Sequence, residues 1–405
     1  MKCSLNELCD YRKGKNAVAT LNNETYISTE NMLPDKAGVT MASSLPNVDY
    51  TQEYKKGDIL VSNIRPYFKK IWQAKVDGGC SNDVLVFEAK SGVCKDFLYY
   101  VLADDAFFTY AMATSKGTKM PRGDKSSIMQ YEVKRFSFEE QSKIASVLCC
   151  IDEKIEINKV INNNLLEQAK VLFDSWFIDF EPFDEEFVVS PIGTNIPSSL
   201  KMVQISELPH ILETGKRPKG GAVSVGIPSI GAENVKKIGE VNLTSAKYIP
   251  VDFAAKMDKG KVHGYELMLY KDGGKPGIFI PHFSMFGEGF PYDEFFINEH
   301  VFKLDFGDKG YNEFAYFYFQ TDYPYNWLAN NGGKAAIPGI NQQDVNSIWI
   351  YSPENPQVKK YCEWIQPTFT TIFKNCLQNV KLTQLRDSLL PKLMSGEINV
   401  SEIDL

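Results

Sequence analysis

Clusters of basic side chains, several of them beside glycines and one with an interleaved tyrosine, are the residues of this chain best suited to bind a ligand. In the first half of the chain these candidates are Arg65, Tyr67, Lys69, Lys70, Lys116, Lys119, Arg122 and Lys125. In the second half they are Lys216, Arg217, Lys219, Lys271, Lys275 and Lys334. Lysine and arginine contact phosphate groups, and a neighbouring glycine lets the backbone approach closely. Each side chain taken singly also fits an ordinary solvated surface charge, but the grouped windows favour contact with phosphate.

Residues for catalysis or metal binding do not have the spacing that such chemistry needs. The 8 cysteines form no CxxC pair and the 4 histidines lie far from them in the sequence, so no metal site is predicted. We expect reduced, mostly buried thiols. The chain has no GxxxxGK[ST] phosphate loop. The stretch MFGEGF (285–290) resembles the glycine loop of a methyltransferase only faintly, because no Asn/Asp-Pro-Pro-aromatic motif accompanies it.

One group of charged residues could imitate a nuclease site. Asp83 is followed by Glu88-Ala89-Lys90, which offers carboxylates and a lysine for a metal-dependent reaction. The corresponding stretch of the second half, Asp305-Phe306-Gly307, has no lysine, and such triplets are common by chance. We therefore predict that this chain has no catalytic residue, no metal and no cofactor of its own.

The distribution of charge and apolar residues indicates a globular protein of two or three domains. The chain has 405 residues, of which 43% are hydrophobic, and a net charge of −7. Residues 139–186 hold 4 lysines and 12 acidic residues, a net charge of −8, so the remaining chain is close to neutral. A basic patch can exist locally. No apolar run is long enough for a signal peptide or a membrane span, and we expect a cytoplasmic protein.

The chain contains two copies of one pattern. SLNEL (4–8) returns as QISEL (204–208), and GDILV (57–61) returns as YELML (265–269). A constant offset then sets in, which relates FLYY (97–100) to FAYF (314–317). The order of these matches indicates an internal duplication.

Each copy consists of a mixed segment and a long helix. DVLVFEA (83–89) and HVFKLDF (300–306) are typical of strands, whereas residues 97–114 have helical spacing. We predict an α+β fold with two globular α/β domains in a pseudo-two-fold repeat, separated by two long antiparallel coiled-coil helices. The expected ranges are a first domain at 1–138, a central helical region and linker at 139–188, a second domain at 189–355 and a C-terminal helical region at 356–405.

A stripe with alternating steps of four and three residues runs along each predicted helix. In the first helix this seam consists of Ile144, Leu148, Ile151, Ile155, Asn158, Asn162, Leu165, Ala169, Leu172 and Trp176. In the second helix it includes Ile365, Ile372, Asn375, Asn379, Leu382, Leu389 and Leu393. Thr368 and Arg386 interrupt the second seam.

Two asparagines recur in register in both seams. A buried asparagine costs stability, but an asparagine that faces another asparagine fixes the axial alignment of two helices. We therefore expect the two helices to pair within one chain, each about 60 Å long. The alternative is that the asparagines lie just off the seam in solvent. A second apolar row, Phe369, Phe373, Cys376 and Val380, would suit contact with a partner protein.

Several stretches resemble the specificity subunits of type I restriction-modification enzymes. FSFEEQSKIASVLCCIDEKIEINKVINNNLLEQAKVLFDSWFIDFEPF (136–183) is similar to the central conserved region of that family. LTQLRDSLLPKLMSGEINV (382–400) is similar to its C-terminal segment. KKGDILVSNIRPYFKKI (55–71) and SKGTKMPRGDKSSI (115–128) resemble recurrent stretches of its target-recognition domains. The resemblance covers nearly the whole chain and includes the duplication.

The resemblance implies a function in DNA recognition. Two target-recognition domains would each read half of a bipartite sequence in double-stranded DNA, and the helices would dock two methyltransferase subunits. Two restriction and translocase subunits would complete the complex, and S-adenosylmethionine, ATP and Mg would bind to the partner subunits. This chain would supply specificity without catalysis, and the basic windows would contact DNA. The alternative is a scaffold that holds two protein partners symmetrically and binds no DNA.

Overall fold

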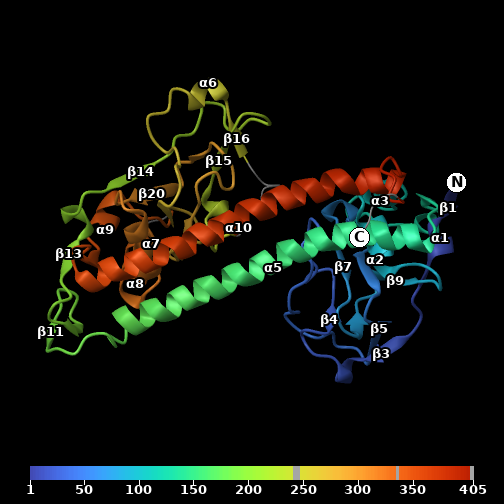
Figure 1. Cartoon of the computed structure of the whole chain (residues 1–405), viewed down its shortest axis with the longest axis horizontal. Coiled ribbons are helices and arrows are strands. Elements are labelled where there is room, and N and C mark those ends of the chain that lie inside the picture. Colours follow the sequence, from blue (N-terminus) through green and yellow to red (C-terminus); the bar gives the residue numbers. More distant parts are fainter. Residues whose placement is uncertain (240–246, 334–336, 402–405) are drawn as a thin grey trace. The chain divides into compact units, whose positions relative to one another are not determined.

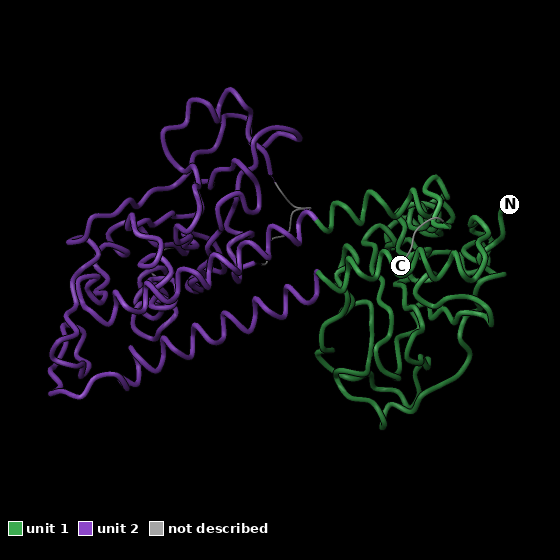
Figure 2. The backbone as a smooth tube through the Cα atoms, in the orientation of Figure 1, with its two compact units in different colours: residues 1–154, 382–405 green, residues 155–381 purple. Residues whose placement is uncertain are grey.

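The computed structural model of this chain describes residues 1–239, 247–333 and 337–401 (Figure 1). Contacts divide it into two compact units (Figure 2): unit 1 is Met1–Lys154 with Leu382–Leu405, and unit 2 is Ile155–Lys381. The two long helices, α5 (Phe138–Phe177) and α10 (Pro356–Ser395), contribute residues to both units. The α+β fold class is confirmed. The four domain ranges expected from the sequence treat the helices as separate regions and stay a prediction.

Unit 1 contains two four-stranded sheets, in the orders β2-β9-β6-β7 and β3-β5-β8-β4, and a two-stranded sheet, β1-β10. The strands are β1 (Lys2–Ser4), β2 (Cys9–Tyr11), β3 (Lys15–Ala17), β4 (Tyr26–Ile27), β5 (Tyr50–Tyr54), β6 (Ile59–Ser62), β7 (Ile71–Gln73), β8 (Gly78–Cys80), β9 (Val84–Ala89) and β10 (Glu132–Lys134). The helices are α1 (Leu5–Leu8), η1 (Val18–Thr20), η2 (Pro66–Phe68), α2 (Lys95–Ala103), α3 (Asp105–Ala113) and α4 (Lys125–Ile128).

The central strands of unit 1 are buried on both faces. Side chains of a strand alternate between the two faces of its sheet. Ile59 and Val61 of β6 pack in one core with α2 and α3, while Leu60 packs in a second core with Ile27 and Tyr54 of the other sheet. This double burial explains why the sequence of β6 is apolar throughout.

Unit 2 repeats this plan. Its sheets have the orders β14-β20-β17-β18, β16-β15-β19, β13-β21 and β11-β12. The strands are β11 (Phe187–Val189), β12 (Asn195–Pro197), β13 (Met202–Gln204), β14 (Ile211–Thr214), β15 (Ile227–Ile230), β16 (Lys247–Ile249), β17 (Leu267–Tyr270), β18 (Phe283–Met285), β19 (Phe296–Ile297), β20 (Val301–Asp305) and β21 (Trp349–Tyr351). The helices are η3 (Ile205–Glu207), η4 (Ala232–Asn234), α6 (Val251–Ala254), α7 (Lys309–Tyr318), α8 (Asp322–Gly332) and α9 (Gln342–Asn346). The strands β14, β20, β17 and β18 follow the same order as β2, β9, β6 and β7, so the duplication in the sequence is a duplication of fold.

Asparagines join α5 to α10 in unit 2. Asn158 Nδ2 donates to Asn379 Oδ1 at 2.8 Å, and Asn375 Nδ2 donates to Asn162 Oδ1 at 2.9 Å. The helices run antiparallel here, because residue numbers rise along α5 as they fall along α10. Each asparagine meets the repeat counterpart of the other one, and the side chains of Asn158 and Asn162 are buried. The asparagines therefore lie between the helices and not in solvent.

An ion pair joins the same two helices in unit 1. Arg386 Nη1 lies 2.8 Å from Asp152 Oδ1, so the residue that interrupts the predicted seam has a partner on the opposite helix. Ile144 and Leu148 share a core with Leu393 in this unit. The helices are again antiparallel.

The buried row differs from the predicted seam beyond Asn162. Of the predicted seam only Ala169 is buried there, together with Leu166, Phe173 and Phe177, whereas Leu165, Leu172 and Trp176 are only partly buried. In α10, Leu390 is buried and Leu382 and Leu389 are partly buried. A straight α-helix drifts by about 20° per heptad from a strict seven-residue repeat. Phe173 also packs on Phe314 of α7, with ring centroids 5.4 Å apart, so this end of α5 has a second neighbour.

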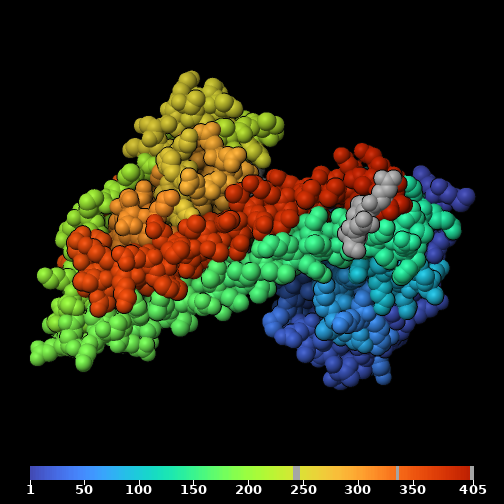
Figure 3. Space-filling view, in the orientation of Figure 1, coloured from blue at the N-terminus to red at the C-terminus, as the bar shows by residue number. Residues whose placement is uncertain are grey.

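The second apolar row of α10 has its partner within the chain. Phe369, Phe373 and Cys376 are buried in the core of unit 2, and Val380 packs against that core. The ring of Phe373 lies 5.4 Å from that of Tyr265. The expectation that this row contacts a partner protein is therefore wrong. One side of α10 is nevertheless open to solvent (Figure 3), and Trp364 and Leu385 are among its exposed side chains.

None of the described helices has the length and apolarity that a membrane crossing requires.

Candidate nucleic-acid interface

In unit 1 the backbone brings the two basic windows of the sequence together. The N–H of Arg65 donates to the carbonyl of Pro121 at 2.8 Å, and the N–H of Gly123 donates to that of Asn63 at 3.2 Å. Ile64 and Arg122 form an antiparallel bridge between these bonds. The N–H of Asn63 also donates to the carbonyl of Asp83 at 2.8 Å. We call residues 63–65, 83 and 121–123 the first crossing.

The second basic window forms a small loop on this crossing. Lys116 and Arg122 exchange two backbone hydrogen bonds of 2.9 Å each, which closes the residues between them into a turn. Gly117 has a φ of +95°, a conformation that side chains other than glycine rarely adopt. Lys119 and Met120 lie at the exposed tip. This loop presents its basic side chains outward from the crossing.

Several of the predicted contact residues are held by carboxylates. Lys69 Nζ lies 2.8 Å from Asp105, and Arg122 Nη2 lies 3.1 Å from Asp83. Lys116 binds Asp124, and this hydrogen bond is the main reason why the pKa of Asp124 lies well below its usual range. These acids orient the basic side chains and reduce their net charge.

The remaining candidates of unit 1 differ in exposure. Tyr67 is half exposed and its ring lies 4.7 Å from that of Phe68. Lys125 Nζ lies 6.0 Å from the ring centre of Tyr11. Lys70 Nζ donates to the carbonyl of Thr29 at 2.6 Å, and burial lowers the pKa of Lys70. Lys70 therefore ties two loops together and is the least available for a ligand.

Unit 2 repeats the crossing bond by bond. The N–H of Gly273 donates to Pro338 at 2.9 Å, the N–H of Ile340 donates to Lys271 at 2.8 Å, and Asp272 forms a bridge with Gly339. The N–H of Lys271 also donates to His300 at 3.0 Å. Each of these residues is the repeat counterpart of a residue in the first crossing. The number of positions between the two is the offset of the repeated segment that contains them. We call residues 271–273, 300 and 338–340 the second crossing.

The side chains of the second crossing form a different polar group. His300 Nδ1 lies 2.5 Å from Asp272 Oδ1, and His300 Nε2 lies 3.4 Å from Glu299. Lys271 Nζ donates to the carbonyl of Glu299 at 3.1 Å. Arg217 lies 3.8 Å from the same glutamate. Glu299 and His300 therefore connect the two basic windows of this unit.

A small cavity of about 160 Å³ lies beside this group. It is lined by Lys216, Arg217, Pro218, Ala222, Ser229, Lys247, Tyr248, Ile249, Asn298, Glu299 and His300. Lys216 Nζ donates to Asp258 at 2.6 Å at its edge. The cavity is small and predominantly basic, which suits a phosphate group or one base.

The other candidates of unit 2 are less constrained. Lys219 and Lys275 are exposed on loops, while Lys334 lies outside the described residues. The sequence interpretation missed Asp83, Asp272, His300 and Lys247. The sequence suggested Asp83 only for nuclease chemistry, and among the described residues no cluster of three or more metal-binding side chains exists. The constant offset of the duplication, which relates Asp83 to His300, was the signal that could have found this position.

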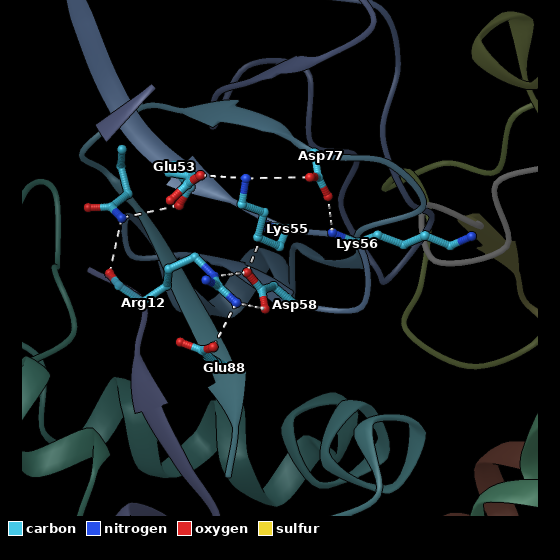
Figure 4. Close-up of polar contacts among 8 residues, drawn as sticks. Arg12, Glu53, Lys55, Lys56, Asp58, Asp77 and Glu88 are labelled. Carbon is cyan, nitrogen blue, oxygen red and sulfur yellow. Dashed lines mark hydrogen bonds and ion pairs between the residues drawn. The ribbon is translucent and has the colours of Figure 1, made fainter. Parts of the chain in front are cut away.

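A buried ion pair lies at the other end of β6 (Figure 4). Asp58 accepts a hydrogen bond of 2.8 Å from the N–H of Lys55 and binds the guanidinium of Arg12. Glu88 lies 2.9 Å from the same guanidinium. The hydrogen bond to Asp58 is the main reason why the pKa of Arg12 is raised. This pair anchors the strand that leads to the first crossing.

Unit 2 has an acid at the same position of its strand. Glu266 accepts hydrogen bonds from the N–H groups of His263 at 2.8 Å and Gly264 at 2.7 Å. Its cation is Lys303 of β20, which lies 3.9 Å from Glu266 and 2.9 Å from Glu213. Both strands therefore begin at a buried carboxylate and end at a crossing.

Known proteins resemble this chain over most of its length. Residues 1–167 match the family model described as type I restriction modification DNA specificity domain. The specificity subunit of the type I restriction enzyme MjaIX of Methanocaldococcus jannaschii is 28% identical over 324 residues, which cover 78% of this chain and 71% of that protein. The specificity subunit of the HindI enzyme of Haemophilus influenzae is 24% identical over 449 residues, with 93% and 94% covered.

A solved structure with a similar fold comes from the same group of proteins as these relatives. The crystal structure of a type I restriction-modification S subunit from M. genitalium has a TM-score of 0.52 and 16% identity, and the match covers 97% of this chain and 96% of that one. The family resemblance of the sequence is therefore confirmed.

Proposed function

We propose that this chain, a relative of the type I restriction-modification specificity subunits, recognises DNA sequence for such a system. The observation that carries the proposal is the crossing, which occurs once in each unit and presents basic side chains on the same backbone scaffold. Two similar scaffolds with different side chains suit a target of two unlike halves. Phosphate contacts position a protein on DNA, and side chains that reach base edges provide specificity.

The remaining parts of the chain suit docking. Methyltransferase subunits, two in number, would bind along the exposed sides of α5 and α10, and restriction subunits would join that complex. S-adenosylmethionine, ATP and Mg would act on those partners, and this chain would contribute no catalytic group. The distance between the two halves of the DNA target would follow from the helices that both units share.

The test uses this chain in complex with its methyltransferase subunits. The triple variant Lys116→Ala, Lys119→Ala and Arg122→Ala removes three cations from the loop on the first crossing. We expect weaker binding to duplex DNA and a salt dependence reduced by up to about three ions, because each cation that contacts a phosphate releases a counterion. Assembly with the methyltransferase subunits should be unchanged.

A matched control removes three basic side chains elsewhere in unit 1. Lys2, Lys13 and Arg135 are exposed, and two of them are ion-paired, as in the loop on the first crossing. Their replacement by alanine should leave DNA binding unchanged. A wild-type complex that binds all duplexes equally, or none, would contradict the proposal and favour a scaffold for proteins.

A further inference from the structure

The two crossings place different side chains on equivalent backbone positions. Asp83 corresponds to His300, and Arg122 corresponds to Gly339. The backbone bonds are the same in both, so the fold does not dictate these side chains. Residues that differ on a shared scaffold are candidates for the groups that distinguish one half of a target from the other.

Arg122 has the most pre-organised donor group of the first crossing. Its Nη2 lies 3.1 Å and 3.3 Å from the two carboxylate oxygens of Asp83, while 55% of its side chain remains exposed. Within the described part of the chain, no acceptor binds its Nε or Nη1. A guanidinium held on one side keeps its other donors in a fixed plane, which favours bidentate binding.

Two polar atoms beside Arg122 lack partners. Asn63 Oδ1 and Arg65 Nε are both buried, and neither has a hydrogen bond to a described residue. Arg65 also has a φ of +50°, which is uncommon for residues other than glycine. Unpartnered buried polar atoms are rare in folded proteins, and backbone strain of this kind concentrates at functional sites. Asn63 Oδ1 and Arg65 Nε are therefore two polar atoms of the first crossing that no described residue satisfies.

The second crossing excludes an arginine at the equivalent position. A Cβ atom on Gly339 would lie 2.7 Å from Asp272 Cβ and 3.0 Å from the carbonyl of Lys271. Asp272 fills that space and holds His300 instead. His300 thus stands where unit 1 has the acid Asp83, and the acid of this pair, Asp272, stands at the counterpart of Ile64.

We propose that Arg122, oriented by Asp83, reads the edge of a guanine in the half of the DNA target bound by unit 1. Arginine that binds guanine O6 and N7 is the commonest specific contact in the major groove. A base is favoured over a phosphate, because the carboxylate of Asp83 beside the guanidinium would repel a second anion. The inference rests on the proposed function and adds to it a residue and a base.

The experiment uses the complex with methyltransferase subunits and a pool of duplexes in which each target position is varied. For the wild-type complex, we expect one guanine to be required in the first half. Arg122→Ala should lower the preference for that guanine by roughly tenfold to a hundredfold, while the preferences in the second half stay unchanged. Arg122→Lys keeps the charge but loses the planar fork, so it should lose the same preference while overall affinity falls less.

Arg135 provides a matched control. Its side chain is 54% exposed and paired with Glu7, much as Arg122 is paired with Asp83. Arg135→Ala should leave every preference unchanged.

Two results would overturn the inference and leave the proposed function intact. An equal loss of affinity for all sequences, with a salt dependence reduced by about one ion, would make Arg122 a phosphate contact. Unchanged preferences in both Arg122 variants would remove it from the interface. A wild-type complex without sequence preference would instead overturn the proposed function, and the inference with it.

Discussion

The two units differ more at the crossings than at the buried carboxylates, although one strand in each unit connects the two places. Asp58 and Glu266 are both acids at the start of that strand, and each has a cation, Arg12 after β2 in unit 1 and Lys303 of β20 in unit 2. At the crossings the polar pair is Asp83 with Arg122 in unit 1 and Asp272 with His300 in unit 2. Burial constrains the first place, because an unpaired charge in the interior is costly. The paired side chains of the crossings are partly exposed and can change.

Removal of each buried cation tests how strongly that constraint acts in the two units. Lys303 is 5% exposed and lies within 4 Å of both Glu213 and Glu266, so Lys303→Met leaves the buried Glu266 and the partly buried Glu213 without their cation. We expect a loss of about 3–5 kcal/mol in the free energy of unfolding. Arg12 is 16% exposed and its second acid, Glu88, is 48% exposed, so Arg12→Met should cost only about 1–3 kcal/mol. Urea denaturation of both variants measures the difference, and equal losses would contradict the comparison.

An acid on equivalent helices gives a second comparison. Asp96 of α2 is exposed and accepts a hydrogen bond from Gln73, whereas Glu313 of α7 is completely buried and has no partner among the described residues. Burial raises the pKa of Glu313 from its ordinary value near 4.5 to about 9. Between these values the folded state keeps a proton that the unfolded state loses, so the stability of the chain falls as the pH rises from 4.5 to 9.

The amide variant removes this dependence. Glu313→Gln cannot ionise, and at pH 8 it should be more stable than the wild type by about 2–4 kcal/mol, an advantage that disappears near pH 4.5. Thermal unfolding across this pH range measures the effect. Asp96→Asn is the control and should change little. A Gln variant that is no more stable at pH 8 than at pH 5, relative to the wild type, would show that Glu313 is not held neutral.

Substitutions at the asparagine contacts between α5 and α10 are expected to have the smallest effect on stability. Asn158→Leu with Asn375→Leu removes the donors that bind Asn379 Oδ1 and Asn162 Oδ1, and each unpaired oxygen should cost about 1–2 kcal/mol. Asn158→Leu with Asn379→Leu replaces both members of one pair and should cost less. Denaturation of the two double variants measures this difference in stability. Complexes of these variants with the methyltransferase subunits report which spacing of the DNA target they accept. Equal stability and unchanged spacing would mean that the asparagine pairs do not set the alignment.

The sequence predicted what depends on local periodicity and missed what depends on distant contacts. The long helices and the strands β9 and β20 could be predicted because their residue patterns repeat every few positions. Residues 97–114 had one helical spacing, but the structure divides them into α2 and α3, and the side chain of Asp104 caps the second helix.

The candidate site shows the same limit. The windows around Arg65 and Arg122 were predicted separately, and the hydrogen bond between Arg65 and Pro121 that joins them has no local signal. Burial of Lys70 depends on the distant Thr29, so the sequence could not separate it from its exposed neighbours. The positions of the crossings follow from the duplication. The roles of Asp83 and His300 depend on the side chains that pair with them, which are distant in the sequence.

Unit 1 takes its residues from both termini of the chain, and this has a consequence for synthesis. Val400 and Leu393 are buried in the same core as Ile144, and Lys143 Nζ donates to the carbonyl of Ser401 at 3.3 Å. A ribosome that has not yet translated Leu393 has therefore produced a globule with an unfinished core. Such remote contacts also slow folding. We expect residues 1–154 to reach their native form only after residues 382–401 have been translated.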